Sequence, residues 1–183
     1  MDVKSLSKFL SLILRHKPET VGIKLDAGGW ADVNELLRGM KRGGKTISFA
    51  DLEKVVAEND KQRFSFNADK NKIRANQGHS INVDVELEEK IPPTKLFHGT
   101  LEKNSAQIER DGILKMSRLY VHLSADIETA EKVARRRKGT PLIYEVDAAK
   151  MSADDFTFYQ SVNGVWLTNH VPAKYLSRLE IEK

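Results

Sequence analysis

The sequence predicts an α+β protein in two parts, and three observations lead to that prediction. Apolar residues at helical spacing dominate the first third of the 183-residue chain, short alternating runs dominate its second half, and an acidic segment ending in Pro92-Pro93 separates them. Because helix signals gather early and strand signals late, we expect a C-terminal half with a largely antiparallel sheet.

The N-terminal part has the signals of three helices and a hairpin. A first helix is predicted at "SLSKFLSLILRH", whose apolar residues form one stripe at helical spacing. A second follows Asp32 and Glu35, which have capping-box spacing, and a third follows Ser48 and Asp51, which repeat it. "RFSFNADKNKIRA" then alternates on both sides of a polar turn, as a β-hairpin does. This order predicts a winged-helix lobe over residues 1–80.

Residues 81–93 predict a strand followed by a rigid linker. Apolar and polar residues alternate in "INVDVELEE", which favours a half-buried strand, and the two prolines then mark a boundary. Residues 94–183 form the second domain. Helices are expected at "KNSAQIERDGI" and "DIETAEKVARRRK", and strands near "KLFHGT", "RLYVHLS", "PLIYEVD", "FTFYQ", "GVWLT" and "RLEIE".

Composition limits the class of protein. With 40% hydrophobic and 31% charged residues the chain resembles an ordinary soluble protein, and its apolar runs are shorter than the about 20 residues that cross a bilayer. The N-terminus lacks a signal-peptide pattern, so we expect a cytoplasmic protein without membrane association. No cysteine is present, and the five histidines have no metal-ligand spacing, so no metal is expected. The net charge of +4 only weakly favours a polyanionic partner.

Arg15 and His16 are the first candidate functional residues. At the end of a helix they could simply interact favourably with the helix dipole, or they could form an anion site that includes a group titrating near neutral pH. Arg63, at the start of the hairpin, is expected either to be solvated or to contact a nucleic-acid backbone.

Two further candidates lie in the second domain. His98-Gly99-Thr100 ends a strand, and the turn either is merely tight or lets the backbone approach a ligand closely, since Gly99 has no side chain. "MSRLYVHLS", taken as a strand, places an arginine, a phenol and an imidazole on one face. The run Arg135–Lys138 is expected to be a solvated helix end, with a phosphate contact as the alternative.

Seven segments together resemble the NAD-dependent RNA 2′-phosphotransferase family, also known as tRNA 2′-phosphotransferase. They are, in order, "LSLILRHKPE", "DAGGWADVNELL", "KQRFSF", "IRANQGHS", "LFHGT", "MSRLYVHLS" and "GVWLT". The resemblance implies a winged-helix lobe, a C-terminal lobe similar to ADP-ribosyltransferases, and an active site between them.

The resemblance also implies roles for individual residues. The family's catalytic Arg-His-Arg-Arg set falls on Arg15, His16, Arg63 and Arg118, and its NAD-contacting turn falls on His98, Gly99 and Thr100. Tyr120, His122 and Ser124 of the next segment are added as NAD-binding candidates. Where relatives usually have histidine, this chain has Tyr120, which is a poor proton carrier near pH 7 because the pKa of tyrosine is about 10.

The implied reaction uses NAD as co-substrate and needs no metal. An internal RNA 2′-phosphate is ADP-ribosylated with release of nicotinamide, and ADP-ribose 1″,2″-cyclic phosphate then leaves the RNA with a free 2′-hydroxyl. The expected partners are NAD and a 2′-phosphorylated RNA such as a tRNA splice junction, and the expected state is a monomer. Two alternatives stay open: an ADP-ribosyltransferase acting on terminal phosphates of RNA or DNA, and a non-enzymatic winged-helix nucleic-acid binder.

Overall fold

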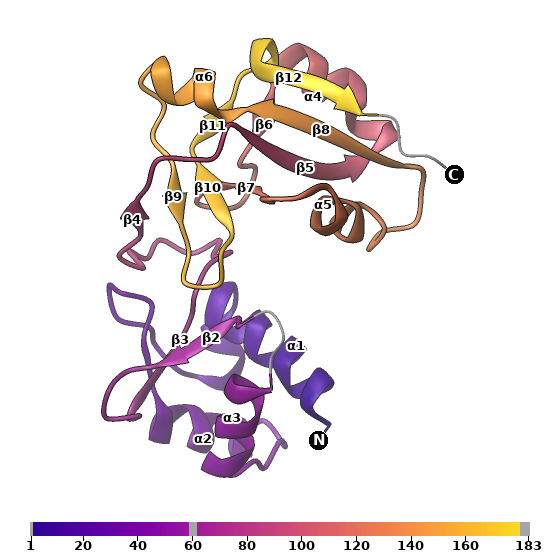
Figure 1. Ribbon diagram of the computed structural model, residues 1–183. Coiled ribbons are helices and arrows are strands. Elements are labelled where there is room, and N and C mark those ends of the chain that lie inside the picture. The colour runs from indigo at the N-terminus through magenta and orange to yellow at the C-terminus, as the bar shows by residue number, and fades with distance from the viewer. Residues whose placement is uncertain (1, 59–61, 180–183) are drawn as a thin grey trace. The chain divides into compact units, whose positions relative to one another are not determined.

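The computed structural model describes residues 2–58 and 62–179 and divides into two compact units, Met1–Glu86 and Leu87–Lys183 (Figure 1). The boundary falls within the segment 81–93 that the sequence marks as strand and linker. Among the residues described, no helix has the length and apolar character needed to cross a bilayer.

The first unit begins with the helices that the sequence predicts. Asp2 caps the first by accepting a hydrogen bond from the Ser5 N–H, Asp32 caps the second, and Ser48 forms a full capping box with Asp51 at the third. The helical segments are α1 (Val3–Arg15), η1 (Pro18–Val21), α2 (Val33–Arg42) and α3 (Phe49–Ala57).

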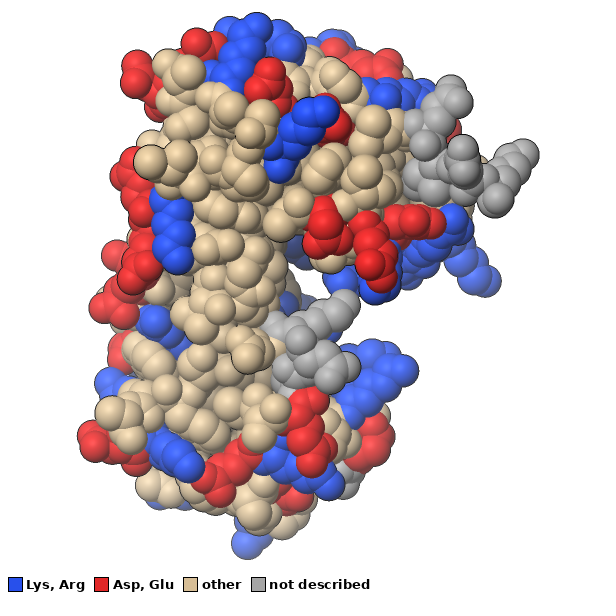
Figure 2. Space-filling model, in the orientation of Figure 1, with Lys and Arg blue, Asp and Glu red and all other residues tan. Residues whose placement is uncertain are grey.

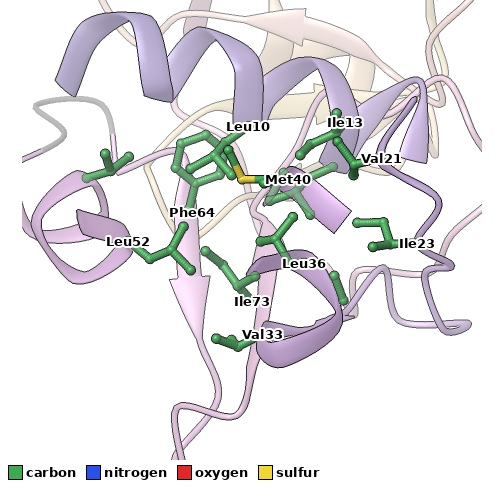
Figure 3. Packing of buried hydrophobic residues seen from close by; sticks show 14 of the residues in the cluster. Leu10, Ile13, Val21, Ile23, Val33, Leu36, Met40, Leu52, Phe64 and Ile73 are labelled. Atoms are coloured by element: carbon green, nitrogen blue, oxygen red, sulfur yellow. The ribbon is translucent and has the colours of Figure 1, made fainter. Parts of the chain in front are cut away.

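A small antiparallel sheet completes this unit. The predicted hairpin is present as β2 (Phe64–Phe66) and β3 (Lys72–Ala75), and β1 (Ala31–Asp32) adds a third strand in the order β1-β3-β2. The helices and the sheet enclose one apolar core, which Figure 3 shows. Fully buried members of this core include Leu10, Ile13, Leu36, Met40, Leu52 and Ile73.

The expected strand over residues 81–89 is wrong for most of its length, because only β4 (Glu88–Glu89) is a strand. Glu86 has a left-handed backbone (φ 55°), which interrupts an extended chain, and its N–H bonds to the Asp84 carboxylate. Asp84 in turn donates its N–H to the carbonyl of Ala27. The segment therefore lies along the first unit as irregular chain.

The second unit contains antiparallel strands in two main sheets, as the sequence predicts. One has the order β12-β8-β5 and the other the order β4-β9-β10-β7, and a two-stranded pair β11-β6 lies apart from them. The strands are β5 (Lys95–Leu101), β6 (Ile113–Leu114), β7 (Val121–Leu123), β8 (Pro141–Asp147), β9 (Tyr159–Gln160), β10 (Trp166–Thr168), β11 (His170–Val171) and β12 (Leu176–Leu179).

Short helices pack on these strands around a second core that includes Leu96, Tyr144, Val146 and Phe158. The helical segments are η2 (Glu102–Asn104), α4 (Ser105–Asp111), α5 (Ile127–Ala134), α6 (Ala148–Ala153) and η3 (Ala173–Tyr175).

Three elements of this unit are shorter than predicted. Strand β7 begins only at Val121, because Met116 has a left-handed backbone (φ 54°) and the Arg118 N–H closes a turn onto the Lys115 carbonyl. Helix α5 ends at Ala134, so the run of cations follows the helix instead of closing it. The strand expected at "FTFYQ" is only β9, and the end of "RLEIE" lies outside the described residues.

Candidate functional site

Helix α1 of the first unit ends in two of the predicted catalytic residues. Arg15 is its last residue and His16 is its C-cap, whose N–H bonds to the Leu12 carbonyl. The Arg15 side chain is half-buried, with Nε and Nη2 shielded from solvent, whereas His16 is exposed. A side chain that only interacted with the helix dipole would have no need of this burial.

A five-residue segment, Asn76–Ser80, contacts all three predicted catalytic residues of this unit. The Asn76 N–H bonds to the Arg63 carbonyl at 2.9 Å, and the Ser80 N–H bonds to the Arg15 carbonyl at 3.0 Å. Ser80 Oγ lies 2.9 Å from Nδ1 of His16. The segment therefore fixes the end of α1 and the start of β2 at once.

Gly78 lets this segment pass close to Arg15. Its backbone is left-handed (φ 88°), and a Cβ added there would lie 3.5 Å from Nη1 of Arg15. A residue with a side chain would be strained by this left-handed backbone.

His79 is the buried histidine of the segment, with only 1% of its surface exposed. Burial, together with the nearby positive charges of Arg15, His16 and Arg74, lowers the pKa of His79 to about 4. A neutral imidazole therefore packs beside the Arg15 cation at neutral pH, and it adds no further positive charge there.

Arg63 lies just before β2 and is half-buried. Its neighbour Phe64 points into the core with 2% exposure, which is the alternation that the sequence predicts for this strand.

The second unit has a pocket of about 400 Å³ that contains most of the remaining predicted residues. It is lined by the predicted NAD-binding residues His98, Gly99, Thr100, Tyr120 and His122, and by the predicted catalytic Arg118. Although Arg118 and Tyr120 precede the strand on which they were expected, the turn brings them to the same pocket as His122.

Ser124 is not among the residues that line this pocket. It forms a β-bridge with Phe97, through hydrogen bonds of 2.9 and 2.7 Å between the two backbones. Ser124 thereby joins the strand β7 segment to β5, and its assignment to NAD binding remains a prediction.

Two histidines of the pocket have defined tautomers. Nδ1 of His98 lies 3.2 Å from the carbonyl oxygen of His122, and Nδ1 of His122 lies 3.0 Å from that of Tyr120. Because a carbonyl oxygen only accepts, each Nδ1 carries a proton. Burial lowers the pKa of His98, and the positive charge of Arg118 acts in the same direction. His98 is therefore a neutral ring whose Nε2 can accept a hydrogen bond.

Gly99 is required by packing as well as by the pocket. A Cβ at this position would lie 1.9 Å from the Ala130 carbonyl oxygen of α5 and 3.0 Å from the Ala134 N. The missing side chain therefore lets α5 lie directly on β5. Beside it, Thr100 Oγ1 accepts a hydrogen bond from Asn104 Nδ2 at 3.0 Å, and both residues line the pocket.

Positive charge dominates the pocket, since Lys115, Arg118, Arg136 and Arg137 all line it. The described lining residues include no Asp or Glu. Partial burial lowers the pKa of Arg118, and the charges of Arg137 and Arg136 lower it further, although the guanidinium remains protonated at neutral pH. Such a pocket is complementary to an anionic ligand rich in phosphate.

A hollow of about 470 Å³ in the first unit differs in character. Asp26, Asp32 and Glu35 line it together with cations, and it includes none of the predicted site residues. Over the described part of the chain, no group of three or more His, Asp or Glu side chains could hold a metal ion.

Three residues of these sites were not predicted from the sequence: Ser80, Asn104 and Lys115. Ser80 and Asn104 stand within or near quoted motifs, but nothing local to them reveals a partner. Lys115 looks like a solvated cation in the sequence, and only the pocket gives it a second significance.

Comparison with known proteins identifies close relatives. The family model described as "RNA 2'-phosphotransferase, Tpt1 / KptA family" matches residues 1–170. A probable RNA 2′-phosphotransferase of Fusobacterium nucleatum is 54% identical over 175 residues, which are 96% of this chain and 97% of the relative. Proteins of the same description from Flavobacterium johnsoniae and Trichormus variabilis are 53% and 55% identical, and each match covers at least 93% of both chains.

Proposed function

The chain belongs to the RNA 2′-phosphotransferase, Tpt1 / KptA family, and we propose that it transfers an internal RNA 2′-phosphate to NAD in two steps. The first unit is then a winged-helix lobe that receives RNA, and the second is an ADP-ribosyltransferase-like lobe that binds NAD. The observation that carries this proposal is the pocket where Arg118 and the His98–Thr100 wall occur together without a carboxylate.

NAD fits the chemistry of this pocket. Its pyrophosphate is an anion, and its riboses and bases need neutral hydrogen-bonding groups. The Arg118 guanidinium supplies positive charge for the first requirement, and His98, Thr100 and Asn104 supply the second. We assign NAD binding to His98, Gly99, Thr100, Tyr120 and His122. Ser124 supports this site by joining the end of β7 to β5.

In the first step an oxygen of the RNA 2′-phosphate attacks C1″ of the nicotinamide ribose. The bond from C1″ to the nicotinamide nitrogen breaks, and nicotinamide leaves with the electron pair. The nucleophile is already an anion, so the task of the protein is to position it. Arginine suits this task because its planar fork binds phosphate oxygens in pairs and stays charged. We assign this binding to Arg15, Arg63 and Arg118.

In the second step the ribose O2″ attacks the phosphorus, and the bond from phosphorus to the RNA O2′ breaks. The O2″ proton must be removed, and the RNA oxygen must gain one. We assign proton removal to Nε2 of His16, with its Nδ1–H donating to Ser80 Oγ, and the proton that His16 takes up then passes to the RNA O2′. This leaves an RNA 2′-hydroxyl and ADP-ribose 1″,2″-cyclic phosphate.

The test follows a labelled internal 2′-phosphate in an RNA oligonucleotide incubated with NAD and the protein. Label that reaches ADP-ribose cyclic phosphate supports the proposal. Label retained on ADP-ribosylated RNA identifies an ADP-ribosyltransferase that stops after the first step, and unchanged RNA leaves only a binding protein.

The variants Arg63→Ala and Arg118→Ala test the roles of these arginines. Each is expected to accumulate the ADP-ribosylated RNA, since the second step builds the most negative charge on the phosphoryl group. Full turnover in either variant removes that arginine from the mechanism. A double variant with Arg15→Ala that loses no more rate than the single variants indicates that the residues act on one group.

A further inference from the structure

Three cations of the pocket, Lys115, Arg136 and Arg137, have no role in the mechanism above. They lie beyond the four residues assigned to catalysis, and all three side chains are exposed where they line the pocket. We call these three residues the cationic rim. In Figure 2, Lys and Arg side chains lie among Asp and Glu side chains around α5 and the loop that follows it.

The end of helix α5 does not by itself explain the rim. Its C-cap is Arg135, and that guanidinium is paired with Glu131 one turn earlier, at 2.7 Å. Neither Arg136 nor Arg137 has an ion pair with a residue in the described ranges 2–58 and 62–179. Of three consecutive arginines, one is neutralised and two line the pocket with their charge uncompensated.

The rim also places like charges close together, which is electrostatically unfavourable in the pocket without a ligand. Arg136 and Arg137 are near enough to Arg118 to lower its pKa, so three guanidinium groups repel one another at one place. Such an arrangement is stabilised when several phosphate groups bind together.

The shape and exposure of the site indicate which phosphates these are. A pocket of about 400 Å³ can enclose a small ligand but not an RNA strand. An internal 2′-phosphate is flanked by phosphodiesters on both sides, so the strand must leave the pocket across its exposed edge. The neutral groups His98, Thr100 and Asn104 are half-buried on the wall, whereas the rim residues face solvent.

We propose that the cationic rim binds the phosphodiesters that flank the RNA 2′-phosphate and so selects internal 2′-phosphates within a strand. This inference rests on the proposed function, because it takes an RNA strand as the substrate. Arg118 then holds the 2′-phosphate itself, and Lys115, Arg136 and Arg137 hold the backbone beside it.

The test compares the double variant Arg136→Gln/Arg137→Gln with the control Arg135→Gln. The control removes an arginine of the same run that is paired with Glu131 and does not line the pocket. Binding of a fluorescent single-stranded RNA with one internal 2′-phosphate is measured by anisotropy without NAD. The KM values for RNA and for NAD are measured separately, and thermal melting verifies folding.

We expect the double variant to bind the RNA about tenfold more weakly and to have a correspondingly higher KM for RNA, with the KM for NAD unchanged. The slope of log affinity against log salt should become shallower by about 1.4, as for two lost contacts to a single strand. The control should match the wild type in every measurement.

Three results would overturn the inference. A raised KM for NAD with unchanged RNA binding would assign the rim to the NAD pyrophosphate. An effect no larger than that of Arg135→Gln would make the rim an ordinary charged surface. Equal weakening for RNA with and without flanking nucleotides would show that the rim does not read the strand. If wild-type protein binds the RNA but transfers nothing, the proposed function fails while the rim can still be judged from binding.

Discussion

Ser80 contributes to the orientation of His16. The two side chains are 64 positions apart in sequence, and yet Oγ and Nδ1 are 2.9 Å apart. This contact restrains the exposed imidazole of His16. In the proposed mechanism the Ser80 hydroxyl accepts from Nδ1–H of His16, which leaves the lone pair on Nε2 to take the O2″ proton.

We therefore expect Ser80→Ala to slow the second step roughly five- to tenfold, which corresponds to the loss of one hydrogen bond of about 1 kcal/mol. Rapid-quench measurement of the decay of ADP-ribosylated RNA, repeated across pH 6 to 8, should show the lower rate and a shifted pH profile. Ser80→Thr keeps the hydroxyl and should restore both, and Ser177→Ala, an exposed serine on β12, is the matched control. An unchanged rate and pH profile in Ser80→Ala would show that Ser80 does not influence His16.

His79 makes the stability of the protein sensitive to acid. It is neutral in the folded state because its pKa is about 4, whereas in the unfolded chain the ordinary pKa near 6.5 applies. Between pH 4 and pH 6.5, His79 therefore binds a proton in the unfolded chain that it does not bind in the folded protein. Stability is therefore complete above pH 6.5 and falls as the pH decreases toward 4.

The loss attributable to His79 between pH 7 and pH 5 should be roughly 2 kcal/mol in the free energy of unfolding. Urea unfolding at the two pH values should give a steeper fall for the wild type than for His79→Gln, whose side chain does not titrate. The two slopes are compared rather than the absolute stabilities, since His79→Gln also changes packing. Equal slopes would mean that His79 is not buried as a neutral ring.

At the scale of elements, helix α5 depends on one glycine of the strand beneath it. Gly99 allows close contact between α5 and β5, and the same helix end carries Arg136 and Arg137 to the pocket. Gly39 has a similar role in the first unit, where a Cβ would lie 2.3 Å from the Val21 carbonyl oxygen. In both places a glycine is needed because backbone atoms of two elements meet.

Gly99→Ala should therefore destabilise the protein by roughly 3 kcal/mol, since the backbone of α5 must move away from β5. Thermal melting gives the size of the effect, and hydrogen exchange should show lost protection in α5 and in β5. Gly43→Ala is the matched control, because φ is −79° there and an added Cβ meets its nearest neighbour at an ordinary 3.5 Å. A Gly99→Ala variant as stable as this control would contradict the packing argument.

Helices and strands were predicted correctly where the sequence signal lies in neighbouring residues. The helices of the first unit were predicted correctly because apolar periodicity and capping are properties of neighbouring residues. The strand expected at "MSRLYVHLS" was too long because alternation carries no information on the left-handed backbone of Met116. Likewise, the alternation after residue 80 hid the left-handed Glu86.

At the scale of the whole molecule, each unit has its own core, and the two units contain different parts of the proposed chemistry. Arg15, His16 and Arg63 belong to the first unit, and Arg118 with the NAD-binding candidates belongs to the second. The required positive charge is supplied throughout by guanidinium and ammonium groups, which are permanently cationic at neutral pH.

We accordingly expect phosphate transfer to continue in the presence of EDTA, within about twofold of the untreated rate. The physical reason is that arginine clamps can neutralise phosphoryl charge in the role that metal ions fill elsewhere. The labelled-RNA assay with and without EDTA makes the comparison, and the calcium–EDTA complex serves as the control for ionic strength. A loss of activity that added magnesium restores would contradict this expectation.

The sequence by itself determined the α+β class, the helices and hairpin of the first unit, and the antiparallel strands of the second. These follow from periodicity, capping and side-chain type, all of which are written locally along the chain. Only the tertiary structure decided that Ser80 reaches His16, that Gly99 serves the packing of α5, and that two of three consecutive arginines line a pocket. Those contacts join residues that are distant in sequence or alike in type, and packing alone distinguishes them.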